Sequence, residues 1–216
     1  MVICHIPSDH PEKSREKGLS SKSLKFARLD GHEELSRHGE FRITVYSPRG
    51  DIKSKELLGR PISVVLTTPR DSTREFNGVA TGFYQLGQHG RYHQYLLIVR
   101  PWTWLLTRTS DCKIFQDQTV RQIIEAVFAD HPYADFEFQL TARYKTWDYC
   151  VQYRESDFNF VSRLMEQEGM HFFFRHTAGK HTLVIADSLT AHQAAPGYAT
   201  LPFHEPEARR ARQDEG

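Results

Sequence analysis

The chain has 216 residues, of which 39% are hydrophobic and 25% are charged, a composition typical of a soluble globular protein with one substantial core. Its formal net charge of +1 gives no global attraction to nucleic acid or to an anionic membrane. The three cysteines, Cys4, Cys112 and Cys150, have no paired spacing, so we expect no disulfide framework and a reducing compartment. No apolar run reaches the length of a signal-peptide core or a membrane span, which predicts synthesis and folding in the cytoplasm.

The first half of the chain has the pattern of short strands. Residues 1–23 are polar without a periodic apolar face and predict a disordered leader. Short alternating or apolar runs separated by turn residues follow it, at 24–26, 41–45, 62–66, 76–84 and 92–99. This spacing predicts a small antiparallel β-barrel. Because Gly78 and Gly82 interrupt the fourth run, we expect a bent strand with close backbone approach there, in preference to a hairpin turn.

Two tryptophans follow the last of these strands, at Trp102 and Trp104. Bulky aromatic rings are normally part of a core. We therefore expect them to close one end of the barrel and not to bind a ligand.

Two helices are expected in the second half. Thr119 and Gln122 form a capping box for a helix that runs to about Ala129 with a single apolar face, and His131 with Pro132 ends it.

Ser156 caps the second helix, and Asp157 adds negative charge at the positive end of its dipole. Gly169 is placed for a left-handed C-terminal cap. Strands at 170–174 and 181–185 then form a hairpin, and residues 136–138 begin another strand.

No chemical motif in the sequence predicts a reaction. Twelve histidines are present. No cysteine or carboxylate completes a metal-ligand set with His89 and His93, or with His171, His176 and His181. We therefore interpret the histidines as surface residues. Two of the last three could face each other across the hairpin.

Other sites are equally poorly supported. Glu155 and Asp157 are explained by the helix dipole, and nothing indicates the cleft that a glycosidase needs. There is no nucleophile elbow, no phosphate loop, and no activating context for Cys112 or Cys150. The arginines at 209, 210 and 212 are followed by acidic residues and predict a solvated linker and not a nucleic-acid patch.

Several runs resemble the VgrG family, the spike proteins of bacterial type VI secretion, which are related to the tail hubs of contractile phages. They are YRESDFNFVSRL at 153–164 followed by Glu168 and Gly169, and, in family order, LLGRP at 57–61, FNGV at 76–79, RPWTWLL at 100–106 and IFQ at 114–116. The resemblance covers roughly residues 24–188. The residues that match the family signature are Trp102, Trp104, Arg154, Glu155, Ser156, Asp157, Phe160, Glu168 and Gly169. We expect those around the second helix to hold it onto the barrel.

The resemblance implies an α+β, mostly β fold: a tail-hub-like antiparallel barrel with two packed helices at 24–188, a disordered leader at 1–23, and a linker with the start of a truncated second barrel at 189–216. It also implies a structural, non-enzymatic role without a cofactor. The hub would form a homotrimer in the full-length protein, dock on the hexameric Hcp tube, contact baseplate and effector proteins, and leave the cytoplasm through the type VI apparatus without a signal peptide. No nucleic acid or small-molecule substrate is expected.

Three alternatives stay open: a hub protein of a prophage contractile-tail baseplate, a truncated and non-functional VgrG remnant, and a hydrolase effector. A hydrolase would be favoured by polar side chains clustered in one pocket with shifted pKa values.

Overall fold

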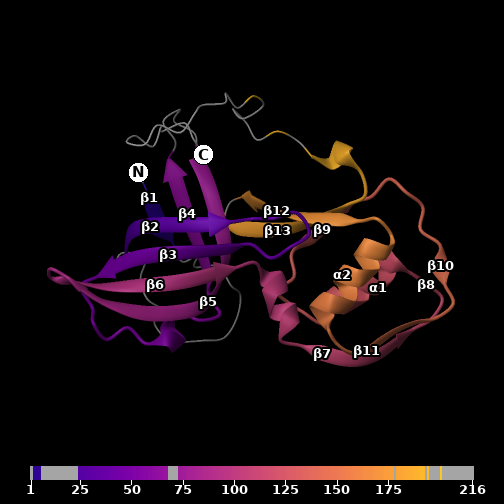
Figure 1. The fold of residues 1–216 in the computed structure, drawn as a ribbon, viewed down its shortest axis with the longest axis horizontal. Coiled ribbons are helices and arrows are strands. Elements are labelled where there is room, and N and C mark those ends of the chain that lie inside the picture. Colours follow the sequence, from indigo (N-terminus) through magenta and orange to yellow (C-terminus); the bar gives the residue numbers. More distant parts are fainter. Residues whose placement is uncertain are drawn as a thin grey trace.

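The computed structural model describes residues 24–67, 73–177 and 179–192, the backbone of Val2–His5, and residues 194 and 200. Figure 1 shows two lobes side by side: a lobe built from the large sheet, with the short 3₁₀ helix Ser54–Glu56, at one end and a lobe that carries both α-helices at the other. Each lobe has its own cluster of buried apolar side chains. We call them the sheet lobe (Val2–His5 with 24–100) and the α+β lobe (101–188).

The sheet lobe is one six-stranded antiparallel sheet with the spatial order β1-β4-β5-β6-β3-β2. Its strands are β1 (Val2–His5), β2 (Lys25–His32), β3 (Glu40–Ser47), β4 (Pro61–Thr67), β5 (Thr73–His89) and β6 (Tyr92–Arg100). Alternate residues of β3, for example Ile43 and Val45, are buried on the inner face, as a strand period of two requires. The edge strands β1 and β2 approach each other without pairing. The expected small barrel is therefore a curled half-barrel (Figure 1).

The long strand β5 bends where the sequence predicted it. Its register to β6 shifts between Ala80 and Gly82, which marks a bulge. A Cβ atom on Gly78 would lie 2.6 Å from Val99 Cγ1 and 2.8 Å from the carbonyl oxygen of Arg100. The expectation of a bent strand with close backbone approach is confirmed.

The α+β lobe combines two helices with three small sheets. Its elements are β7 (Ser110–Phe115), β8 (Gln118–Thr119), α1 (Val120–Ala129), β9 (Phe136–Gln139), β10 (Thr146–Trp147), β11 (Cys150–Ser156), α2 (Asp157–Gln167), β12 (His171–Thr177) and β13 (Lys180–Ala186). The sheets are β12-β13-β9, β11-β7 and β10-β8, and β9 runs parallel to β13 whereas the other pairs are antiparallel. The predicted hairpin is thus present as β12 and β13.

Both helices begin and end as the sequence predicted. The Thr119 hydroxyl accepts a hydrogen bond from the backbone of Gln122, and the Gln122 side chain accepts one from Thr119, so the capping box of α1 is complete. The Ser156 side chain accepts from the Asn159 backbone at the start of α2. Gly169 follows α2 with a φ of +71°, the left-handed conformation of a helix C-terminal cap.

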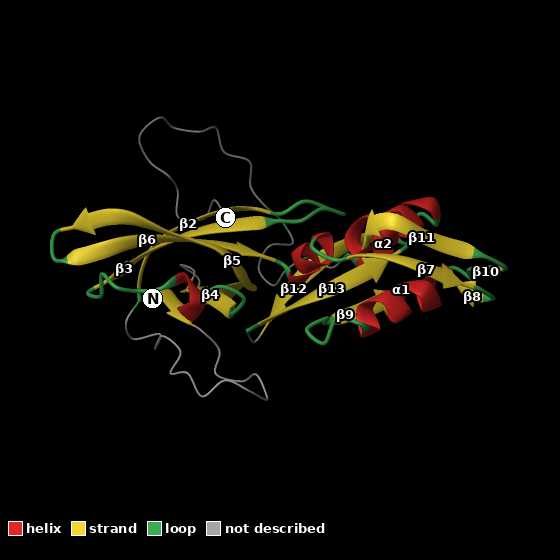
Figure 2. Cartoon of the chain, turned by 90° about the horizontal axis from the view of Figure 1, so that it is seen from below, coloured by secondary structure: helices red, strands yellow, loops and turns green. Residues whose placement is uncertain are grey.

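The structure corrects two expectations about packing. Trp102–Thr107 is a 3₁₀ helix, and Trp102 belongs to the core of the α+β lobe, so it does not close an end of the barrel. The buried face of α2 packs in that same core and not on the six-stranded sheet; Figure 2 shows both helices away from that sheet. The strands of the α+β lobe provide the apolar surface on which α2 packs. The sequence pattern shows that α2 has an apolar face but not which sheet covers it.

The two ends of the chain are described only in part. Val2–His5 pairs with β4, so the expected disorder of the leader does not extend to these four residues, and residues 6–23 lie outside the described part. A short 3₁₀ helix, Leu189–Ala191, follows β13; most of the remaining segment, where we expect a linker and the start of a second barrel, lies outside the described part. The domain limits at 24 and 188 stay predictions. In the described residues, no helix has the length and apolar character needed to span a membrane.

Candidate functional site

The densest group of signature residues surrounds the start of α2. The strand β11 carries a bulge between Tyr153 and Glu155, and Arg154 has a φ of +52° there, an uncommon conformation for a residue with a side chain. After the bulge, the Glu155 carboxylate accepts a hydrogen bond of 2.8 Å from Arg163 Nη2 on α2. The bulge and this ion pair set the direction in which the chain enters the helix.

Asp157, the first residue of α2, is buried with 6% exposure. Its Oδ2 accepts hydrogen bonds from the Thr109 hydroxyl at 2.6 Å and from His131 Nε2 at 3.0 Å. Its Oδ1 accepts from the Gln152 amide at 2.7 Å. A buried carboxylate is tolerated only when it is paired and hydrogen-bonded, and here three side chains from three different segments satisfy that condition.

Electrostatics around this carboxylate favour the ionised form. Burial raises the pKa of Asp157, but hydrogen bonds from Thr109, Gln152 and His131 outweigh that effect and hold the pKa below its ordinary value of 3.8. Because a carboxylate can only accept, His131 Nε2 is the donor, and in the neutral ring Nδ1 accepts from the Tyr133 hydroxyl at 3.0 Å. The group therefore joins the end of α1 to the start of α2.

The aromatic signature residues have different surroundings. Phe160 is fully buried and stacks on Phe115 with ring centroids 5.6 Å apart. Trp102 lies in the same core, and its indole N–H donates to the Asp135 carbonyl at 3.1 Å. Trp104 instead lies between two guanidinium groups, 5.1 Å from Arg100 and 4.5 Å from Arg108.

The remaining signature residues, Glu168 and Gly169, lie at the other end of α2. The structure thus gathers Glu155, Ser156 and Asp157 at one end of the helix, with Phe160 on its buried face. It does not bring all nine signature residues into one site.

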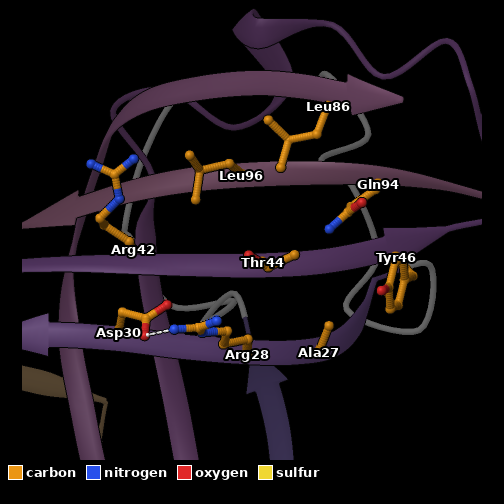
Figure 3. Close-up of a pocket in the computed structure, with 9 residues that line it drawn as sticks. All are labelled: Ala27, Arg28, Asp30, Arg42, Thr44, Tyr46, Leu86, Gln94 and Leu96. Atoms are coloured by element: carbon orange, nitrogen blue, oxygen red, sulfur yellow. Dashed lines mark hydrogen bonds and ion pairs between the residues drawn. The ribbon is translucent and has the colours of Figure 1, made fainter. Parts of the chain in front are cut away.

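A shallow depression of about 370 Å³ lies on the sheet lobe (Figure 3). Its lining comes from β2, β3, β5 and β6 and consists of Ala27, Arg28, Asp30, Arg42, Thr44, Tyr46, Leu86, Gln94 and Leu96. Arg28 is paired with Asp30 at 2.6 Å, so part of its charge is satisfied within the depression. Its charged residues, Arg28, Asp30 and Arg42, lie together at one end of the depression (Figure 3).

The histidines do not all lie on the surface, which corrects that interpretation. His131 is 7% exposed, and burial lowers the pKa of His181 to about 3 and that of His38 to about 4. His176 and His181 are cross-strand partners on β12 and β13, as the hairpin pattern allowed. In the part of the chain that the structure describes, no three His, Cys, Asp or Glu side chains come together as metal ligands.

Sequence reasoning missed three of the residues that hold Asp157. Thr109 and Gln152 carry no local signal for this role, and His131 was interpreted only as part of a helix stop. A search for polar residues able to pair with a carboxylate at the first turn of α2 could have raised His131 as a candidate, but its position 26 residues earlier leaves the pairing to the tertiary fold.

Comparison with known proteins defines the class. The model of the phage tail baseplate hub family matches residues 32–215, and the chain belongs to this family.

The chain is similar to two type VI secretion system spike proteins of Pseudomonas aeruginosa. It is 43% identical to VgrG1b over 196 residues, which are 91% of this chain and 26% of that protein. It is 45% identical to VgrG1a over 183 residues, which are 85% of this chain and 28% of that protein. The chain therefore spans about a quarter of the length of these curated relatives.

A solved structure gives the same assignment of fold. The E. coli c3393 protein, described as a component of the type VI secretion system with structural similarity to bacteriophage T4 tail proteins gp27 and gp5, matches with a TM-score of 0.69 and 28% identity. The match covers 79% of this chain and 50% of that one. The resemblance to the VgrG family and the mostly-β, tail-hub-like fold are thereby confirmed.

Proposed function

We propose that this chain forms the first part of the hub of a VgrG-like type VI secretion spike, and that it works by docking to other proteins and not by catalysing a reaction. The observation that carries the proposal is the family match over residues 32–215, together with the similarity to spike proteins along most of the chain. These relatives are named as spike proteins of the type VI secretion system.

The chemistry of the candidate site supports a structural role. Both oxygens of Asp157 are occupied by side chains of the protein itself, and the ring of His131 is bonded on both nitrogens. An acid or base that reacts with a substrate needs an atom within reach of that substrate. These groups instead stabilise the junction between α1 and α2.

The partners follow from the same proposal. In the full-length protein the hub would form a homotrimer, stack on the hexameric Hcp tube, and contact baseplate and effector proteins without a cofactor, nucleic acid or small-molecule substrate. A Francisella VgrG has been solved in complex with PdpA, which supports a spike that carries other proteins. The chain would leave the cytoplasm through the type VI apparatus without a signal peptide.

A second candidate is a hub protein of a prophage contractile tail. The family that matches is described as a phage tail baseplate hub. A prophage MuSo2 tail protein from Shewanella oneidensis shares the fold with a TM-score of 0.53 at 14% identity. The greater identity to spike proteins favours the first candidate.

Deletion of the gene in its host tests the two candidates together. We expect Hcp to disappear from the culture medium while its intracellular level is unchanged, and the wild-type gene to restore release. Unchanged release of Hcp would contradict the spike proposal. Loss of intact tails from induced phage particles, with Hcp release unaffected, would establish the prophage alternative.

A further inference from the structure

The two lobes meet along the hairpin β12–β13. On one side, the backbone N–H of Ser36 donates to the Phe172 carbonyl at 2.8 Å, and the Phe172 N–H donates to the Ser36 hydroxyl at 3.2 Å. On the other side, the Asn77 side-chain amide donates to the Lys180 carbonyl at 2.9 Å. The hairpin is therefore held by polar contacts from two different parts of the sheet lobe.

His176 lies in the middle of this contact, and both of its ring nitrogens have hydrogen-bond partners. Its Nδ1 is 2.9 Å from the backbone nitrogen of Asn77; an N–H can only donate, so Nδ1 carries no proton. Its Nε2 is 2.9 Å from the Glu33 carboxylate, which accepts, so Nε2 carries the proton. A second proton on Nδ1 would face the Asn77 N–H and break that bond.

His181 is under a similar constraint. Its Nε2 accepts a hydrogen bond of 2.8 Å from the backbone N–H of Trp102, and its ring centroid lies 6.3 Å from that of His176. Burial is the main cause that lowers the pKa of His181 to about 3, and the nearby His176 lowers it further. His181 and Trp102 both belong to the α+β lobe, so this bond fixes the hairpin to the segment through which the chain enters that lobe.

His38 supplies the third imidazole, from the loop between β2 and β3. Its ring lies 3.9 Å, centroid to centroid, from that of Phe158 on α2. Burial lowers the pKa of His38 to about 4; a hydrogen bond to the Thr103 backbone opposes this, and the charge of Arg100 adds to it. We call His38, His176 and His181 the histidine seam.

The charged groups that face the seam do little to stabilise a protonated imidazole. Arg100 is positive and already paired with Glu40, and Glu75 accepts from the Gly179 N–H at 2.9 Å. On the β13 side, Asp135 is bonded to Thr182. Among the described residues, Glu33 forms an ion-pair contact with a seam imidazole, that of His176. It accepts from Nε2 and so would not replace the bond that Nδ1 makes with the Asn77 N–H.

We propose that the histidine seam is a pH-sensitive contact between the lobes, which acidification opens while each lobe keeps its own core. The closed seam excludes protons that free histidines bind below their ordinary pKa of about 6.5. Lower pH therefore favours the open state. For each histidine that cannot take up a proton in the closed state, the ratio of closed to open molecules falls by about tenfold per pH unit below pH 6.5. For His38 and His181 together, this ratio is about 10³-fold lower at pH 5 than at pH 6.5.

Hydrogen exchange of single amides tests the proposal, since the bonded N–H groups report on the seam directly. Protection of Ser36 and Asn77, whose backbone N–H groups bond across the contact between the lobes, should fall at least 100-fold between pH 7 and pH 5 after correction for the intrinsic effect of pH on exchange. Protection of Val99 in β6 and Ile124 in α1, which lie in the two cores, should not change. Seam amides that stay protected at pH 5, or core amides that lose protection together with them, would overturn the proposal.

Variants test whether the imidazoles cause the loss of protection at low pH. His176→Asn and His181→Gln place a non-titrating acceptor close to the nitrogen that accepts in each ring, and His38→Phe preserves the aromatic contact. The triple variant should show seam protection that does not depend on pH, whereas the control His171→Asn, on β12 outside the seam, should behave as the wild type. A triple variant with the wild-type pH profile would contradict the proposal. If the triple variant does not fold, the comparison of seam and core amides in the wild type decides alone.

Discussion

The two lobes bury polar groups in different ways. In the sheet lobe the buried tyrosine Tyr95 needs one partner, and its hydroxyl donates to the Arg49 carbonyl at 2.8 Å. In the α+β lobe a buried carboxylate, Asp157, takes three side-chain partners, among them the buried His131. The sheet lobe is specified mainly by alternation of apolar residues along each strand, whereas the α+β lobe depends on polar partners far apart in the sequence.

The largest expected effect comes from removing the carboxylate. Asp157→Ala leaves the buried donors of Thr109, Gln152 and His131 without an acceptor. Each buried donor left without a partner costs about 1–3 kcal/mol, so we expect a loss of about 3 kcal/mol or more of unfolding free energy. Urea unfolding measures this loss. The control Asp30→Ala removes the solvent-exposed partner of Arg28 and should leave the midpoint unchanged. Equal losses for the two variants would refute the contrast between the lobes.

Paired leucine truncations test whether the lobes are separate cores. Leu97 and Leu164 are both fully buried, one in each cluster, and each Leu→Ala change should cost about 2–5 kcal/mol through transfer and cavity terms. Hydrogen exchange should show accelerated opening of β3 and β6 for Leu97→Ala and of α1 and α2 for Leu164→Ala. Equal acceleration in both lobes for either variant would show a single cooperative unit instead.

A smaller effect is expected at the end of α2. Gly169 has a φ of +71° and a Cβ atom there would meet nothing within 4 Å, so a substitution costs backbone strain and not a clash. Gly169→Val should lower the unfolding free energy by about 1–2 kcal/mol, and Gly169→Asn, which tolerates this conformation, should lower it by less. Thermal unfolding of both variants measures the difference. An unchanged melting temperature for the valine variant would contradict the assigned helix end.

The pH dependence gives the smallest expected effect. Because the folded pKa of Asp157 lies below its ordinary value of 3.8, the unfolded chain binds the proton first as pH falls. This part of the stability is therefore complete well above pH 3.8 and is lost as pH falls through the folded pKa. Unfolding free energies of the wild type should fall more steeply between pH 5 and pH 3 than those of Asp157→Asn. Parallel curves for the two proteins would exclude this contribution.

The sequence predicted the local elements well. The capping box at Thr119, the Ser156 cap and the left-handed Gly169 each depend on residues within one turn of the helix, and the bent strand at Gly82 follows from glycines within one strand. These features could be predicted because their causes are local.

The failures concern contacts between distant segments. Trp102 could not be assigned to a core by its own pattern, because a buried ring fits either lobe equally well. The helix α2 was placed on the wrong sheet for the same reason, since an amphipathic face shows that an apolar surface exists but not which one. The buried pairing of His131 with Asp157 requires α1 and α2 to be packed first.

The central claim is that the chain is a docking component of a hub. Electron cryomicroscopy of a spike–tube assembly that contains the full-length product of this gene tests it most directly. We predict three copies of both lobes at the end of the spike that faces the Hcp tube, with the cores as described here. A single copy placed away from the tube, or an assembly whose tube-facing end is built from another protein, would contradict the claim.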